Sequence, residues 1–258
     1  MEIKKTHIYL ASDSTVQSYA KTYYPQTGWG QVFVQFFKNS DHIEVSQPTS
    51  CSYSLAKRYE TDSLVIENRS IGGRSSRSFI EEGKLDELLQ VIEAGDYLFV
   101  QFGHNDASID RPNRYVSVED FPLYIQKYID ACKERNVTCV LVTPVARRNC
   151  DENNGEFKIS FSGYRDAMIR ISEEQNIPLL DLGYHSYEYL KSTGIEESKE
   201  LYMWVEEGEY PDGAHKDGLK DNTHLSRKGA LIYAEILTKL ILAYNKDSQL
   251  DEIKALLS

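Results

Sequence analysis

The stretch YLFVQFGHND, residues 97–106, joins an apolar run to a polar turn. Residues 97–102 are nearly all apolar, which is typical of a strand that is buried on both faces of a parallel sheet. The next four residues are a glycine, a histidine, an asparagine and an aspartate. The stretch therefore predicts a central parallel strand whose carboxyl end carries polar side chains.

Apolar runs of this kind alternate with helical patterns along the chain, without an internal repeat or a low-complexity linker. Such alternation indicates βαβ units around a parallel sheet, so the predicted class is α/β with about five strands. A length of 258 residues fits one large domain or two small ones, and the missing linker favours a single domain over residues 1–258. The predicted strands are residues 7–11, 64–68, 97–102, 139–143 and 178–182, and the predicted helices are residues 29–37, 84–93, 119–135, 162–175 and 226–244.

Residues 196–223 depart from this alternation. The segment contains many acidic residues, three glycines and one proline, together with Tyr202, Trp204 and Tyr210. A loop of this length within a compact domain is often a functional lid. An ordinary surface insertion is an equally good interpretation, and both remain open at this point.

Charge and cysteine content exclude several classes of protein. The chain carries 29 basic and 40 acidic residues, and its net charge of −11 disfavours binding to nucleic acid or to anionic membranes. No stretch approaches the ~20 apolar residues that span a bilayer. The N-terminus lacks the apolar core of a signal peptide, which favours a cytoplasmic protein, or a secreted one whose leader has been removed. The four cysteines form no CxxC pair, so we expect reduced thiols and no zinc or other metal.

Polar residues collect where the predicted strands end. In an open parallel sheet, ligands bind outside the carboxyl ends of the strands. Hydroxyl, glycine, amide, guanidinium and imidazole groups are therefore expected at one edge of the sheet. The segments that supply them are SDST (12–15), RSIGGRSSR (69–77), GHND (103–106), PVARR (144–148) and, before the last helix, DNTH (221–224).

These segments contain every group that an acyl-transfer site needs. Ser14, in the first strand-to-helix turn, is the candidate nucleophile, and His224 is the candidate base. Asp221, three residues before the histidine, could orient the imidazole. The backbone N–H groups of Ser14 and Gly73 and the side-chain amide of Asn105 could hold the oxyanion.

The chain also contains a competing Asp-x-x-His sequence, Asp212 to His215. We prefer Asp221 and His224 because the last predicted helix begins directly after them and would anchor them. Each of the polar segments that supply these residues is a weak signal alone. The prediction rests on their order along the chain and on their expected position at one edge of the sheet. The glycine pair before Arg74 is not a phosphate loop, since no Gly-Lys-Ser/Thr follows.

The pattern as a whole resembles the SGNH (GDSL-like) hydrolase superfamily over residues 6–244. The finer resemblance is to rhamnogalacturonan acetylesterases, carbohydrate esterase family 12. The segments that carry it are DSTV (13–16), GRSSRSF (73–79), QFGHND (101–106), TPVARR (143–148) and DNTHLS (221–226). The resemblance implies a flavodoxin-like three-layer αβα fold, deacetylation without a metal or cofactor, and an acyl-enzyme intermediate. Ser12 stands where the family usually has glycine.

The predicted substrate-binding residues lie in the same segments: Asp13, Arg74, Arg77, His104, Arg147 and Arg148. Arginine suits a uronate carboxylate because its planar guanidinium donates two parallel hydrogen bonds. The alternative is that the arginines cap helices or pair with nearby carboxylates. The acidity of the chain favours short oligomers over long pectin polyanions, and some of its 18 tyrosines and two tryptophans could stack on sugar rings.

The function predicted from the sequence is therefore that of a serine esterase that removes acetyl groups from carbohydrate, with rhamnogalacturonan oligosaccharides as substrate. Acetyl xylan, other acetylated sugars, lipids and thioesters are alternative substrates on the same fold. A non-enzymatic alternative is a carbohydrate-binding protein that has the same fold but no catalytic activity. The expected partner is an acetylated oligosaccharide, and the sequence makes no prediction about the oligomeric state.

Overall fold

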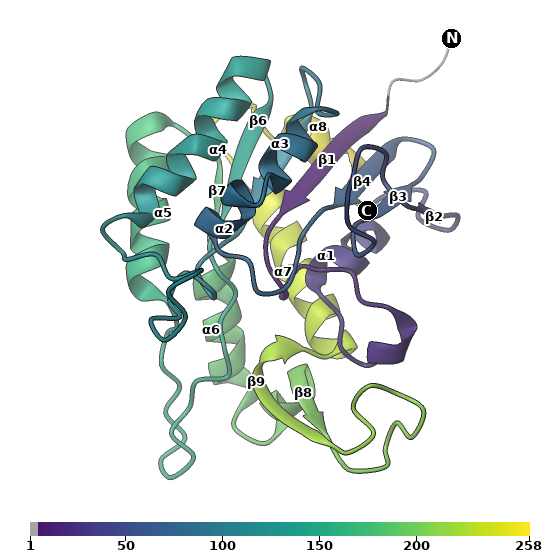
Figure 1. Cartoon of the computed structure of the whole chain (residues 1–258), viewed down its shortest axis with the longest axis vertical. Helices are drawn as coiled ribbons and strands as arrows, with labels where there is room; N and C mark the ends of the chain where they lie inside the picture. Colours follow the sequence, from purple (N-terminus) through teal and green to yellow (C-terminus); the bar gives the residue numbers. More distant parts are fainter. Residues whose placement is uncertain (1–4) are drawn as a thin grey trace.

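A seven-stranded sheet forms the centre of the molecule, and its strand order is β2-β3-β4-β1-β5-β6-β7 (Figure 1). The computed structural model describes residues 5–258. The strands from β4 to β7 in this order are parallel, whereas β3 and β2 are antiparallel at one edge. Their bounds are β1 (Thr6–Ala11), β2 (Glu44–Ser46), β3 (Lys57–Glu60), β4 (Leu64–Asn68), β5 (Tyr97–Val100), β6 (Thr138–Val142) and β7 (Leu179–Leu180).

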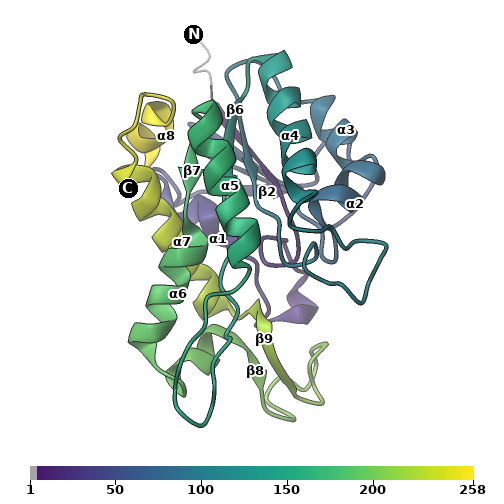
Figure 2. The same ribbon diagram turned by 90° about the vertical axis from the view of Figure 1, so that its left-hand side faces the viewer.

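Helices cover both faces of this sheet, and Figure 2 shows α2, α3 and α4 on one side of the strands and α6, α7 and α8 on the other. One layer contains α1 (Trp29–Val32), α6 (Leu182–Thr193), α7 (Arg227–Ala243) and α8 (Asp251–Leu256). The other contains α2 (Ser76–Glu81), α3 (Lys84–Leu89), α4 (Phe121–Arg135) and α5 (Ser162–Gln175). The predicted α/β class and three-layer arrangement are confirmed.

The alternating side chains of the strands account for the two layers. In β1, Ile8 and Leu10 join the core under α1 and α7, whereas Tyr9 and Ala11 join the core under α4 and α5. All four side chains are buried, as in a strand that is covered on both faces. Among the parallel strands the order is the flavodoxin-like one, in which β1 separates β4 from β5. This order brings the turns after these three strands to the same edge.

The predicted elements agree closely with the observed ones where apolar residues define them. The strand at 64–68 and the helix at 162–175 have the predicted bounds. The predicted helix at 29–37 is α1 followed by the 3-10 helix η2 (Phe33–Phe36). The predicted strand at 178–182 is wrong at its end, because Asp181 accepts a hydrogen bond from the Tyr184 N–H and caps α6.

Residues 196–223 contain regular structure of their own. They form the 3-10 helix η3 (Glu197–Leu201), β8 (Tyr202–Val205) and most of β9 (Leu219–Leu225), which pairs antiparallel with β8. Figure 1 shows this hairpin beyond the carboxyl ends of the central strands. Within residues 5–258, no helix is long and apolar enough to cross a membrane.

Candidate active site

A polar cavity of about 410 Å³ opens at the carboxyl edge of the sheet. Ser14, Gly73, Asn105, Asp221 and His224 all contribute to its lining. They come from the turns after β1, β4 and β5 and from β9. The fold thus brings together the residues predicted to form the triad and the oxyanion site, although the sequence separates them by more than 200 positions.

The turn after β1 presents Ser14 to this cavity. The Asp13 carboxylate accepts hydrogen bonds from the Thr15 N–H at 2.9 Å and the Thr15 hydroxyl at 2.8 Å, which closes a tight turn around the serine. Ser14 is the partly exposed residue in an otherwise buried stretch, residues 12–16. The serine that replaces the usual glycine, Ser12, fits because its buried hydroxyl donates to the Gln101 carbonyl at 2.5 Å.

His224 and Asp221 form a hydrogen-bonded pair on β9. The His224 Nδ1 lies 2.6 Å from the Asp221 Oδ2, and the Asp221 Oδ1 accepts from the N–H groups of Thr223 and His224. Burial raises the pKa of Asp221, but the hydrogen bond and the charge of His224, with the two backbone donors, outweigh it and lower the pKa. An ionised Asp221 holds the proton of the imidazole on Nδ1, which leaves Nε2 free to accept another.

Secondary structure anchors this pair from both sides. The neighbouring Leu225 pairs with Tyr202 across the hairpin, and Ser226 caps α7 by accepting from the Gly229 N–H. The Tyr202 hydroxyl contacts the Ala146 carbonyl at 2.6 Å, which ties β8 to the loop after β6. The hairpin therefore positions Asp221 and His224 relative to the sheet.

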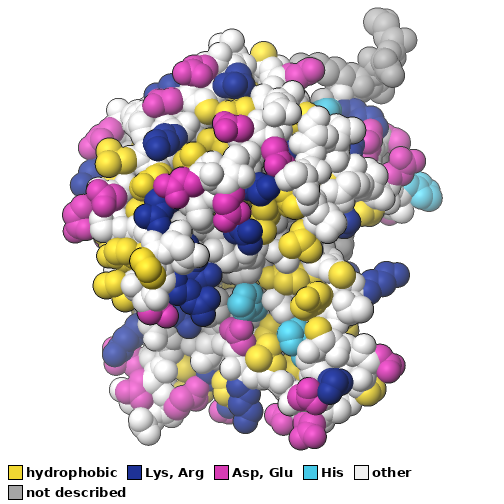
Figure 3. All heavy atoms as spheres, viewed as in Figure 1, with side chains coloured by type: hydrophobic (Ala, Val, Ile, Leu, Met, Phe, Trp, Pro, Cys, Tyr) yellow, Lys and Arg dark blue, Asp and Glu magenta, His cyan; other side chains and the backbone are white. Residues whose placement is uncertain are grey.

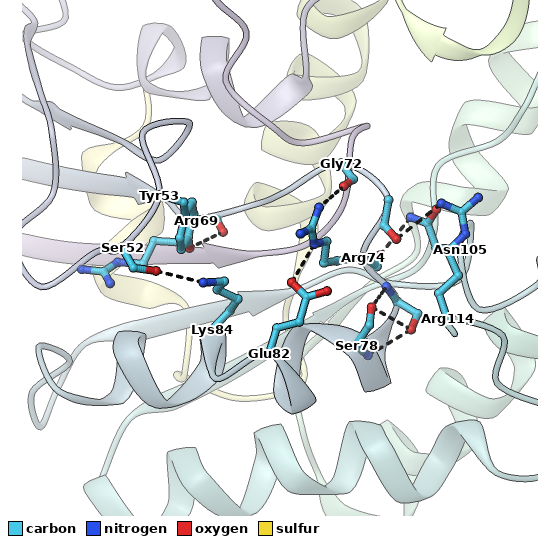
Figure 4. Close-up of polar contacts among 12 residues, drawn as sticks. Ser52, Tyr53, Arg69, Gly72, Arg74, Ser78, Glu82, Lys84, Asn105 and Arg114 are labelled. Carbon is cyan, nitrogen blue, oxygen red and sulfur yellow. Dashed lines mark hydrogen bonds and ion pairs between the residues drawn. The ribbon is translucent and has the colours of Figure 1, made fainter. Parts of the chain in front are cut away.

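The candidate oxyanion donors lie on the neighbouring turns. Gly73 has φ +81°, a left-handed conformation that glycine adopts without strain. The Asn105 Nδ2 donates to the Arg74 carbonyl at 2.9 Å, which orients the amide and leaves its second N–H hydrogen for a ligand. A Cβ added at Gly72 would lie 3.3 Å from the Ser14 Cβ, so this turn packs directly against the serine. Figure 4 shows Gly72, Arg74 and Asn105 together at this edge.

The predicted substrate-binding residues divide into two groups. Arg147 and His104 line the cavity. The His104 Nε2 donates to the Val145 carbonyl at 2.8 Å, and burial lowers the pKa of this histidine, so the ring is neutral. Asp13 is fully buried beneath the serine turn.

Arg74, Arg77 and Arg148 do not line the cavity. Arg74 pairs with Glu82 at 2.9 Å (Figure 4), and Arg77 donates to the Pro112 carbonyl at 2.6 Å. The fully buried side chain of Arg148 is surrounded by hydrogen-bond acceptors, namely Glu152, Ile195, Ser198 and Asn222, and stacks on Trp204. For these three residues the structure shows the local pairing that was the alternative interpretation.

Five residues of the cavity lining were not predicted as site residues, namely Ser108, Phe161, Thr223 and the two arginines Arg111 and Arg114. Both arginines follow the GHND segment in the chain. Their position in the loop after β5, at the edge where ligands bind, is the sequence signal that could have identified them. The competing histidine, His215, lies outside this lining and contacts Gln26 at 3.0 Å. Within the described residues, no three His, Cys, Asp or Glu side chains gather in a metal-binding arrangement.

Comparison with known proteins identifies the family. The family of GDSL-like lipases and acylhydrolases matches residues 11–237, and the chain belongs to this family. It is therefore a carboxylic ester hydrolase, and the resemblance predicted from the sequence is confirmed.

Individual relatives align with about nine-tenths of the chain. The rhamnogalacturonan acetylesterase RhgT of Bacillus subtilis is 34% identical over 236 residues, which are 92% of this chain and 89% of the relative. The probable rhamnogalacturonan acetylesterase YesY of the same organism is 37% identical over 234 residues, 90% of this chain and 91% of the relative.

Solved structures share the fold. The YXIM protein of Bacillus subtilis superimposes with a TM-score of 0.71 at 24% identity, over 93% of this chain and 57% of that one. The acetylxylan esterase Axe2 of Geobacillus stearothermophilus superimposes with a TM-score of 0.59 at 14% identity, over 95% and 98% of the two chains.

Proposed function

We propose that this chain is a carbohydrate acetylesterase that deacetylates rhamnogalacturonan oligosaccharides, with Ser14 as nucleophile, His224 as base and Asp221 as its orienting acid. The observation that carries the proposal is the 2.6 Å contact between the His224 Nδ1 and the Asp221 Oδ2, in the same cavity as Ser14. A histidine held in this tautomer is what activation of a serine hydroxyl requires.

The reaction has two halves. The Ser14 Oγ attacks the acetyl carbonyl carbon while the His224 Nε2 takes the hydroxyl proton. The N–H groups of Ser14 and Gly73 and the Asn105 amide stabilise the oxyanion. The intermediate then expels the sugar oxygen, which takes the proton from His224, and an acetyl-serine remains. In the second half His224 takes a proton from a water molecule as the water oxygen attacks the acetyl carbon. The Ser14 Oγ then leaves with that proton from His224, which regenerates the serine and releases acetic acid, ionised to acetate at neutral pH.

The nature of the cavity supports a sugar substrate. Arginine, asparagine, histidine and serine side chains dominate its lining, and Phe161 is the large apolar residue there. A lipid acyl chain would need an apolar mouth, whereas hydroxylated rings can hydrogen-bond to such walls. The two relatives named as rhamnogalacturonan acetylesterases, each aligned over about nine-tenths of this chain, favour the pectic polymer over other acetylated sugars.

Acetate release from a panel of acetylated pectic, xylan and simple sugar substrates tests the proposal. We expect the highest kcat/KM on rhamnogalacturonan oligosaccharides and background rates for Ser14→Ala on every substrate. Higher kcat/KM on acetyl xylan would contradict the substrate. Equal background rates for the wild type and Ser14→Ala on an aryl acetate would contradict the enzyme and favour a binding protein.

A further inference from the structure

Three arginines, Arg111, Arg114 and Arg147, line the cavity that contains Ser14 and His224. Figure 3 shows basic side chains and a histidine gathered around a hollow near the middle of this face. The acidic residue of the lining, Asp221, is already bound to His224. The cavity is therefore locally cationic in a chain whose net charge is −11.

A turn in the loop after β5 positions two of these arginines. The N–H of Arg114 donates to the Arg111 carbonyl at 3.0 Å, and the Val116 N–H donates to the Asp106 carbonyl at 3.0 Å, which ties the loop back to the GHND segment. A Cβ added at Gly73 would lie 3.3 Å from the Arg114 Nη1. The guanidinium of Arg114 therefore packs against Gly73, a candidate oxyanion donor. Figure 4 shows Arg114 beside Asn105, the other candidate donor on these turns.

The charges of these arginines are poorly compensated by the protein. Within residues 5–258, no carboxylate oxygen lies within 4.0 Å of the guanidinium of Arg114 or Arg147. Arg111 lies 4.0 Å from Asp110, and both side chains are largely exposed, so that this pair contributes little. By contrast, Arg74 and Arg148 have close carboxylate partners.

Arg114 also carries an unused donor. Its Nε is buried and has no hydrogen-bond partner among the described residues, and its Nη1 lies 3.5 Å from the Gly73 carbonyl. Burial and the neighbouring charge of Arg111 lower the pKa of Arg114. The side chain of Arg114 is partly exposed and lines the cavity, so its guanidinium can donate to an anion there.

We propose that Arg111, Arg114 and Arg147 form a subsite for the carboxylate of a uronic acid, on the acetylated sugar or on the sugar next to it. The inference rests on the proposed function and adds the group by which the enzyme selects its substrate. Guanidinium groups match a carboxylate with two parallel hydrogen bonds, and such charged contacts are stronger than neutral ones.

Arg147 extends this subsite toward a second sugar. It lines, together with Phe161, an adjoining cavity of about 350 Å³ whose other walls include the polar residues Asn149, Ser160 and Asn222. The two cavities share this arginine as a common wall. A substrate whose acetyl group lies at Ser14 and which extends from one cavity toward the other would have a neighbouring sugar beside Arg147.

Paired substrates test the proposal directly. An acetylated, uronate-containing oligosaccharide is compared with the same compound after methyl esterification of its carboxylates, which removes the charge and keeps the acetyl group. We expect the wild type to prefer the free acid by about 10- to 100-fold in kcat/KM. Arg114→Gln, Arg111→Gln and Arg147→Gln should each reduce this preference, with Arg114→Gln reducing it most.

The matched control is Arg135→Gln, which removes the same charge in the last turn of α4, just before β6 begins and far from the carboxyl edge. It should keep the preference of the wild type. The ratio of the two substrates is internal to each variant, so partial unfolding lowers both rates and leaves the ratio unchanged.

Two results would overturn the inference while leaving the proposed function intact. One is a wild type that cleaves both compounds equally well. The other is a preference that survives in all three cavity variants. If the wild type cleaves an aryl acetate and none of the sugar esters, the proposed function fails first and the inference with it.

Discussion

Replacing Asp221, the proposed orienting acid of His224, is the sharpest perturbation of this site. In Asp221→Asn the side chain keeps its size, and its oxygen can still accept from the N–H groups of Thr223 and His224. The amide nitrogen then faces the His224 Nδ1, where the Oδ2 now lies at 2.6 Å. Because an amide donates at this position, the imidazole must accept there and carry its proton on Nε2.

The magnitude follows from that change of tautomer. With Nε2 protonated, His224 cannot take the proton of Ser14, and the charge that stabilises the imidazolium is lost as well. In a serine protease the corresponding change lowers kcat by ~10⁴-fold while the geometry stays intact. We expect a loss of ~10³- to 10⁴-fold here, and an unchanged KM, because the substitution keeps the size of the side chain and changes the tautomer of His224, which matters only in the chemical step.

An aryl acetate assay at neutral pH, with thermal unfolding as a check of folding, measures this effect. The control is Asp212→Asn in the exposed competing Asp-x-x-His sequence, which should retain full activity. A kcat for Asp221→Asn within tenfold of the wild type would refute the reasoning. Loss of activity in Asp212→Asn instead would move the base to His215.

Three further changes test other parts of the structure. Asn105→Ala should lower kcat by ~10²- to 10³-fold with little change in KM, since it removes an oxyanion donor; equal kcat values for variant and wild type would remove the amide from the site. Burial raises the pKa of Asp106 to about 7, so the folded state holds a proton that the unfolded state releases, and the contribution of this carboxyl to stability falls as the pH rises from about 4 to 7. Asp106→Asn should flatten this decline in denaturant unfolding, and parallel curves for variant and wild type would contradict it. Tyr202→Phe leaves the Ala146 carbonyl without its donor and should destabilise the protein by about 1–3 kcal/mol without lowering kcat; an unchanged melting temperature would show that this contact does not secure the hairpin.

The elements that could be predicted from the sequence are those with a strong apolar pattern. The buried strand β4 and helix α5 were placed at their observed bounds for this reason. The edge strand β2 is exposed along its whole length, and β3 has one buried residue, so neither carries such a pattern. The predicted count of about five strands describes the parallel part of a seven-stranded sheet.

Part of the site could be predicted from the sequence and part could not. Ser14 and Asn105 could be placed because topology alone brings the carboxyl ends of parallel strands to one edge. The Asp221–His224 pair lies on β9 outside this sheet, and it was placed by its position directly before the last helix. The sequence could not show which arginines line the cavity and which pair with nearby carboxylates, because the partner of a long side chain depends on tertiary packing. Arg148 is enclosed by segments up to 74 positions away, whereas Arg114 reaches the cavity through a loop without periodicity.

The central claim is that Ser14 is the nucleophile. The most direct test is reaction of the enzyme with a phosphonate ester that modifies activated serines, followed by peptide mapping by mass spectrometry. The account predicts one modified residue, Ser14, with activity lost in proportion to its modification, and no labelling in Asp221→Asn at the same exposure. Modification of another residue in step with the loss of activity, with Ser14 unmodified, would contradict it.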